Sequence, residues 1–554
     1  MPDKEPIRSM RHSPDNSSDV HWSVNIAQNV IQAFPNVSTY TFAAGISPSG
    51  IVHFGNFRDV MTSLSVANAV IQQHKSVRLL FSWDDFDRFR KVPVGIDPSF
   101  REHIGRPLAL VPDPLGELPS YAARFEMEFE SSMEELGISL EYRYQMREYK
   151  SGKYDSLIRQ AIDQRREIAN ILLSFMSEKG KDKRGLSEDN YRESYFPISV
   201  YSRFTGKDNT EIISFDDTSS LLTYRCKDTD KTDVVDLAQD RIAKLAWKID
   251  WPMRWKIEDV VFEPGGHDHA SPGGSYDVSS VISRQIFNRE PPIFVGYEFI
   301  GLQGIDGKMS GSSGLAVSPL KLLEIYEPEL LKWLYTRRTP DQGFTLAFDS
   351  EIFRQYDEFD REVQDKLEGK LPTSRQMALD LSFHEGDGPA CPPIPFRQAV
   401  GFGQILQWSV DKMAMLSDAM ALNFNNNSVK KRLKKAKAWL ETYNPQAVLK
   451  LNETINHEYA KTMSTEAFAY VLKLREALCT GMSKINEIEL LVYAIPKDIS
   501  LDQKENAKRQ RAFFKDVYSL LLGSDTGPRL STFLWAVDRA HVLRLLDIQP
   551  IDLY

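Results

Sequence analysis

The stretch from Thr41 to Ser63 constrains the fold of this chain most, because it combines three patterns in a fixed order. Residues 37–44 are short, β-branched and aromatic, which predicts a buried strand. Residues 45–50, Gly-Ile-Ser-Pro-Ser-Gly, form a break where the backbone can approach a ligand closely. From Asn56 onward apolar residues recur at helical spacing. A strand, a glycine loop and a helix N-terminus together predict an anion site, because free N–H groups and the helix dipole face the loop.

Two short motifs make this prediction more particular than a glycine loop alone. Residues 48–56, PSGIVHFGN, resemble the HIGH signature of class I aminoacyl-tRNA synthetases, and residues 308–314, KMSGSSG, resemble their KMSKS signature. The resemblance implies that the two motifs bind ATP, and that four residues are catalytic: His53, Asn56, Lys308 and Ser310. The remaining ATP-binding residues implied by the motifs are Pro48, Gly50, Gly55 and Met309. The fifth-position lysine of the second signature is absent, which could slow activation.

Three further segments are similar to class I lysyl-tRNA synthetases in particular: residues 81–93, FSWDDFDRFRKVP, residues 248–255, KIDWPMRW, and residues 265–270, GGHDHA. The resemblance covers most of the chain and implies that Gly266 and Asp268 meet the ATP ribose. It also implies a pocket for L-lysine, formed by Ala44, Asp84, Asp85, Trp251, His269 and Tyr297.

The acids Asp84, Asp85 and Asp87 follow a predicted strand at residues 77–83, at the strand end where α/β sheets bind ligands. Any one of them reads equally well as part of a solvated loop paired with arginine. As a cluster they favour function, because a buried lysine ammonium needs an acid. Which acid pairs with it stays open. Trp251 either packs against the sheet or walls the lysine stem.

The predicted architecture is multidomain, α/β followed by all-α. A disordered tail spans residues 1–20. A Rossmann-type (HUP-like) parallel-sheet catalytic domain spans 21–345, with a connective insertion at about 95–245. A helical stem and linker spans 346–395, and a helical anticodon-binding domain spans 396–554. The insertion is inferred because His53 and Lys308 lie farther apart than two βαβ halves require.

Composition limits the partners and cofactors. The net charge of −9 means that tRNA must be met by local patches, for which Lys430, Lys431, Lys434 and Arg529 are candidates. Many members of the family that this chain resembles hold zinc in the insertion through paired cysteines. Here only Cys226 is kept, with Ser202, Thr205 and Asp228 where partners are expected, so no zinc is predicted. No apolar run is long enough for a bilayer and no signal peptide core is present, so we expect a cytoplasmic protein without membrane contact. We also expect a monomer.

The resemblance implies a lysine–tRNA ligase that uses ATP with Mg²⁺ to form lysyl-adenylate and then charges tRNA(Lys). Two alternatives stay open. One is a HUP-fold adenylyltransferase acting on a small metabolite, which the helical C-terminus disfavours because such enzymes lack one. The other is a catalytically weakened paralogue that binds tRNA, which the altered 308–314 loop keeps in consideration.

Overall fold

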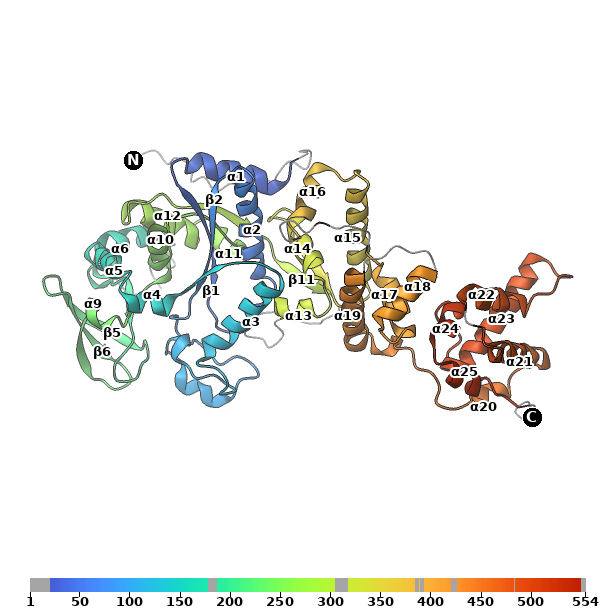
Figure 1. Ribbon diagram of the computed structural model, residues 1–554. Helices are drawn as coiled ribbons and strands as arrows, with labels where there is room; N and C mark the ends of the chain where they lie inside the picture. Colours follow the sequence, from blue (N-terminus) through green and yellow to red (C-terminus); the bar gives the residue numbers. More distant parts are fainter. Residues whose placement is uncertain are drawn as a thin grey trace. The chain divides into compact units, whose positions relative to one another are not determined.

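The computed structural model of the chain describes residues 20–177, 187–303, 317–383, 388, 393–419, 426–482 and 484–549. The chain forms two compact units, each described here by itself (Figure 1). The first unit contains residues up to 347 and the segment 368–388, and the second contains 348–367 and the chain from 389 onward. The predicted catalytic domain therefore matches most of the first unit. The predicted stem and linker, residues 346–395, is instead divided between the two units.

A five-stranded parallel sheet forms the core of the first unit, in the order β10-β9-β1-β2-β3. The first strand in sequence lies in the middle, and the strand order reverses on either side of it. This is the doubly wound arrangement of the Rossmann fold, and it confirms the predicted fold class. The strands are β1 (Thr39–Ile46), β2 (Ser76–Trp83), β3 (Glu141–Tyr144), β9 (Val260–Gly266) and β10 (Ile293–Tyr297).

Helices cover both faces of this sheet, because successive strand residues point to opposite sides. In β1, Phe42 packs with residues of the first two helices, whereas the next residue, Ala43, packs with Trp251 and Tyr276 on the other side. Over β2 and β3, the Phe129 ring stacks on Phe81 with centroids 5.0 Å apart. The helices concerned are α1 (Trp22–Ala33), α2 (Phe57–Ile71), α3 (Tyr121–Glu135), α10 (Trp247–Ile257) and α12 (Ser275–Gln285).

The range predicted as an insertion, about 95–245, contains one strand of the central sheet. Its β3 strand belongs to the central sheet, pairing in parallel with β2, so the core fold extends into this range. The rest holds α4 (Gln145–Ser151), α5 (Asp155–Asp163), α6 (Arg165–Ser174), α8 (Glu188–Ser194) and α9 (Leu237–Asp240). This range also contains an antiparallel sheet of β5 (Thr210–Asp216), β6 (Leu221–Cys226) and β7 (Thr232–Asp236), and the antiparallel pair β4 (Ile198–Val200) and β8 (Ala243–Leu245).

The chain after β10 returns to the start of the same unit. This part of the chain forms β11 (Ile300–Gln303), α13 (Pro319–Leu323), α14 (Pro328–Thr336), β12 (Phe344–Ala347) and α16 (Thr373–Asp380). The short helix α11 (His267–Ala270) lies between β9 and β10. The Thr336 carbonyl accepts hydrogen bonds from His21 Nε2 and Trp22 Nε1, each at 2.9 Å, and the Thr336 hydroxyl donates to the Ala378 carbonyl at 2.9 Å. Residues from three distant parts of the sequence therefore meet at the end of α14.

The second unit contains no strand among its described residues, in agreement with the predicted helical C-terminus. Its helices are α15 (Glu351–Leu367), α17 (Phe396–Ile405), α18 (Val410–Ala419), α19 (Asn426–Tyr443), α20 (His457–Ala460), α21 (Thr465–Cys479), α22 (Ile485–Ala494), α23 (Gln503–Leu522), α24 (Leu530–Ala536) and α25 (Arg539–Leu545). None of the described helices in either unit is both long and apolar enough to cross a membrane.

Candidate active site

A cavity of about 1030 Å³ opens at the carboxyl ends of β1 and β9, where the strand order of the sheet reverses. Open α/β sheets bind their ligands at this switch point, because the loops that leave the strands diverge there. The cavity is lined by nine of the residues predicted from the sequence: His53, Gly55, Asn56, Asp84, Trp251, Gly266, Asp268, His269 and Tyr297. The structure thus gathers most of the predicted site residues around one space.

The loop between β1 and α2 fixes the orientation of His53. The His53 ring accepts a hydrogen bond at Nδ1 from the Gly55 backbone N–H at 3.1 Å. A Cβ atom on Gly55 would lie 2.8 Å from the same ring, so only glycine permits this approach. Burial lowers the pKa of His53, which is therefore neutral at pH 7. A neutral ring that accepts at Nδ1 carries its proton on Nε2, and His53 is a hydrogen-bond donor at that atom.

Both flanks of the second signature also meet this cavity. Leu302, just before it, lines the cavity, and Val317, just after it, accepts a backbone hydrogen bond from Phe54 at 3.0 Å. The Phe54 carbonyl in turn accepts from the Tyr335 hydroxyl at 2.8 Å. The predicted residues Lys308, Met309 and Ser310 lie outside the described residues.

Beside the cavity lies a buried network of charged groups. Arg254 pairs with Asp84 at 2.5 Å and also with Asp250, while Lys244 pairs with Asp87 at 2.8 Å and with Asp250 at 3.3 Å. The Ser47 hydroxyl donates to Asp87 at 2.9 Å, and the Tyr149 hydroxyl donates to Asp250. Three carboxylates face two cations, so the network holds one uncompensated negative charge. Asp84 and Asp87 bring that charge to the cavity wall.

An aromatic wall lies next to this network, and Arg254 lies over the Trp247 ring, 5.7 Å from its centroid. Trp251 is 4% exposed, stacks on Trp247 with centroids 5.0 Å apart, and meets His269 edge-on at 5.9 Å. Trp251 is therefore both a packed core residue and a wall of the cavity, so the two interpretations of its role are compatible. Tyr297 lies at the end of β10, where burial and the neighbouring Asp59 raise the pKa of its hydroxyl.

Sequence reasoning missed two carboxyl groups of the cavity. Burial raises the pKa of Asp59 well above its usual value, and burial raises the pKa of Glu263 to about 7. The Trp255 indole donates to Glu263 at 2.7 Å. Helical spacing could have indicated Asp59, because it follows Asn56 by three positions and so lies on the first turn of α2. No comparable signal marks Glu263, which lies within a strand.

Four predicted residues do not line the cavity. Asp85 lines a different hollow, and its Oδ1 accepts from the Met146 backbone N–H at 2.8 Å. Ala44, Pro48 and Gly50 are buried next to the cavity-lining segment of β1 and its loop. The acidic cluster is therefore divided, because neighbouring residues at a strand end point to opposite sides.

In the insertion, Cys226 is buried, and the Thr205 hydroxyl lies 3.9 Å from its Sγ. Hydrogen bonding around the sulfur, including that from Ser202, lowers the pKa of Cys226 to about 7 against the opposing effect of burial. Over the described ranges, no three His, Cys, Asp or Glu side chains are grouped as ligands of a metal ion.

The basic residues at positions 430–437 of α19 lie on two faces of the helix, one buried and one exposed. Arg432 is fully buried and binds Asp360 at 2.8 Å, and Lys435 is buried as well. Lys430, Lys431 and Lys434 are exposed. The candidate tRNA-binding lysines thus share the solvent face of α19, whereas Arg432 holds the helices of the second unit together. Arg529 pairs with Glu489 at 2.5 Å.

Comparison with known proteins agrees with this geometry. Residues 20–381 match the model of a family described as tRNA synthetases class I (K). The chain is 36% identical to a lysine–tRNA ligase of Streptomyces coelicolor, covering 95% of this chain and 98% of that protein. It is 32% identical to a lysine–tRNA ligase of Treponema pallidum, covering 96% and 98%, and 31% identical to one of Thermococcus kodakarensis, covering 96% and 100%. The chain belongs to the family of class I tRNA synthetases for lysine.

Proposed function

We propose that this chain is a lysine–tRNA ligase, which activates L-lysine with ATP to lysyl-adenylate and transfers the lysyl group to tRNA(Lys). The observation that carries the proposal is the charge of the buried network beside the cavity. Its three carboxylates and two cations leave one negative charge, and Asp84 and Asp87 present it at the cavity wall. A substrate ammonium would bring the network to neutrality.

This charge favours lysine over acidic or amide substrates. A glutamate side chain would add a second negative charge to a wall that already holds Asp84, Asp87 and Glu263. An uncharged side chain would leave the excess negative charge of the network without a cation. Breaking a buried ion pair costs about 3–5 kcal/mol. The flat faces of Trp247 and Trp251 suit the four-carbon stem of lysine.

In the activation step the lysine carboxylate attacks the α-phosphate of ATP and pyrophosphate leaves. This chemistry needs positioning and positive charge more than covalent help from the protein. The Nε2–H of His53, the Asn56 side chain and the N-terminus of α2 would donate to the α-phosphate. No side-chain hydrogen bond ties Asn56 to the helix that it precedes. We assign the pyrophosphate to Lys308 and Ser310, and the ribose to Gly266 and Asp268.

Mg²⁺ would enter this site with ATP. Within the described parts of the chain no three metal-ligating side chains are grouped, which fits an ion coordinated chiefly by phosphate oxygens. When bound, the ion would neutralise phosphate charge. We further propose that the protein acts as a monomer in the cytoplasm.

Pyrophosphate exchange tests this assignment. We expect exchange with L-lysine and not with glutamate or glutamine. Asp84→Asn should lower kcat/KM for lysine by at least a hundredfold, because it removes a buried counter-charge. Asp85→Asn is the matched control, since Asp85 lies outside the cavity, and it should change kcat/KM by less than about threefold. Exchange with no amino acid would favour the weakened paralogue instead, and equal effects of the two variants would place the counter-charge elsewhere.

We propose that tRNA contacts the exposed face of α19. Replacing Lys430, Lys431 and Lys434 with alanine should weaken tRNA charging and flatten its salt dependence, by about 0.9 in log–log slope for each lost phosphate contact. Pyrophosphate exchange should be unaffected. The control replaces Lys504, Lys508 and Lys515 on α23, which removes the same charge from the same unit. A loss of charging in the control alone would assign the contact to α23.

A further inference from the structure

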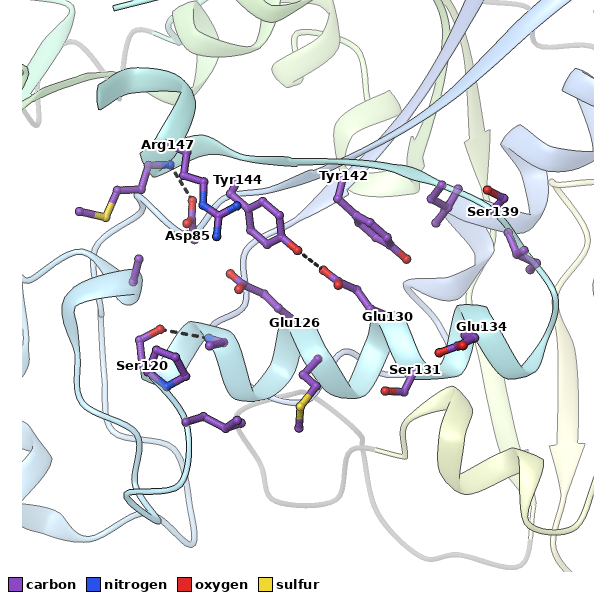
Figure 2. Close-up of a pocket in the computed structure, with 18 of the residues that line it drawn as sticks. Asp85, Ser120, Glu126, Glu130, Ser131, Glu134, Ser139, Tyr142, Tyr144 and Arg147 are labelled. Carbon is purple, nitrogen blue, oxygen red and sulfur yellow. Dashed lines mark hydrogen bonds between the residues drawn. The ribbon is translucent and has the colours of Figure 1, made fainter. Parts of the chain in front are cut away.

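A second hollow, a groove of about 1150 Å³, lies at the far side of the β2 end from the active-site cavity (Figure 2). Its floor is α3, and its other walls come from β3 and the start of α4. Four acidic side chains line it: Asp85, Glu126, Glu130 and Glu134. The proposed lysine–tRNA ligase activity uses none of them.

Two of these carboxylates already have partners within the protein. Asp85 accepts from the Met146 backbone N–H at 2.8 Å. Glu130 accepts from the Trp83 indole and from the Tyr144 hydroxyl, each at 2.8 Å. Asp85 is buried and Glu130 half-buried, and these hydrogen bonds satisfy an oxygen of each carboxylate.

Glu126 is different. It is only 8% exposed, and over the described chain its Oε1 has no hydrogen-bond partner. Figure 2 shows its carboxyl group directed from α3 into the groove, between Asp85 and Glu130. The nearby Arg147 lies over the Tyr144 ring, 4.6 Å from its centroid, and forms no ion pair with Glu126 among the described residues. Burial, with the charges of Asp85 and Glu130, raises the pKa of Glu126 to about 8 against the opposing effect of the Arg147 charge.

The groove combines this acid with an apolar wall. Leu118, Met127, Ile138, Leu140 and Met146 line it together with the ring of Tyr142. A metal ion is disfavoured, because the described residues offer no group of three ligands. An aliphatic ammonium ion fits better, since its stem suits the apolar wall and its head needs one carboxylate and the face of an aromatic ring.

We propose that this groove binds an aliphatic ammonium ion, such as a diamine, with Glu126 as its counter-ion, at a site separate from the lysine cavity. In the free protein at pH 7 Glu126 holds a proton. Binding of the ammonium ion displaces this proton to the buffer, and a carboxylate–ammonium pair replaces the neutral acid.

Calorimetric titration of the full chain with putrescine tests the proposal. Saturating L-lysine and a non-hydrolysable ATP analogue are present, so that the active-site cavity is occupied. We expect one putrescine per chain and, at pH 7, release of up to one proton, measured by comparing buffers of different ionisation enthalpy. Glu126→Gln should weaken binding at least tenfold and abolish the proton release. Glu128→Gln removes the same charge from α3 outside the groove and should change the affinity by less than twofold.

Three results would overturn the site. The first is no binding at millimolar putrescine, and the second is equal binding by wild type and Glu126→Gln. The third is displacement of putrescine by Mg²⁺ at lower concentration than by spermidine, which would assign the groove to a metal ion. None of these outcomes depends on whether the protein charges tRNA, because each is a measurement of putrescine binding with the active-site cavity filled.

Discussion

The active-site cavity and the acidic groove lie on either side of the same strand end and differ in how they compensate buried charge. Asp84 faces the cavity and binds Arg254. Its neighbour Asp85 faces the groove and is held by a backbone N–H. The carboxylates of the cavity network pair with two buried cations, whereas Glu126 in the groove has no hydrogen-bond partner at Oε1 among the described residues, although Arg147 and Lys150 line the groove. The difference indicates that a buried carboxylate can be kept in the fold either by a fixed cation or by a proton.

The largest effect should come from removing the cation of the cavity. Arg254→Met leaves Asp84 and Asp250 short of a partner and should lower the free energy of unfolding by about 3–5 kcal/mol. Urea unfolding measures this. Arg147→Met, at the groove, removes an exposed arginine and should change the free energy by less than about 0.5 kcal/mol. Similar losses of free energy for the two variants would mean that the buried network does not depend on Arg254 for its stability.

The next largest effect should be a gain in the free energy of unfolding, caused by replacing Glu126. Between pH 4.5 and 8 the folded protein keeps a proton on Glu126 that the unfolded chain releases, because its folded pKa is raised to about 8. This residue therefore lowers stability increasingly as the pH rises through that window, by up to about 1.4 kcal/mol for each pH unit. Glu126→Gln should raise the free energy of unfolding by about 3 kcal/mol at pH 7 and by about 1 kcal/mol at pH 5. A difference independent of pH would show that Glu126 is already ionised.

The smallest effect should come from the satisfied acid of the groove. Glu130→Gln keeps an oxygen for Trp83 and Tyr144 but loses the charge that strengthens both hydrogen bonds. We expect a loss of about 1 kcal/mol in urea unfolding at pH 7. The variant should also lower the pKa of Glu126, because Glu130 is one of the charges that raise it, so proton release on putrescine binding should decrease. A gain in stability would mean that repulsion between the two acids outweighs the hydrogen bonds.

Periodicity predicted the Rossmann-type sheet and the helical C-terminus, and the resemblance to class I synthetases implied nine residues that line the cavity. They succeeded because the loop between β1 and α2 is defined by local sequence, as the contact between Gly55 and His53 illustrates. They failed for Asp85, because the residue at which the chain leaves a strand decides which side each neighbour faces. They also missed the network of Lys244 and Arg254, whose partners lie up to 170 positions away.

Local sequence also fails to predict that β3 belongs to the central sheet. Residues 141–144 are only four positions long and lie among helices, so local patterns give no reason to place them in the central sheet. Their pairing with β2 is decided by contacts across the fold, including the stacking of Phe129 on Phe81. On α19, likewise, local sequence does not distinguish Arg432 from the lysines around it, because the burial of Arg432 depends on Asp360, 72 positions earlier.

The meeting of Trp22, Thr336 and Ala378 at the end of α14 has a consequence for synthesis on the ribosome. Trp22 and Ala378 are 356 positions apart, so at ~5–20 residues per second about 20–70 s pass between their translation. During that time α15, which belongs to the other unit, has already been made. During synthesis the first unit therefore lacks its last helix, α16, while α15 of the second unit is already translated. A fragment cut at residue 347 would keep this unfinished state permanently, because it lacks α16.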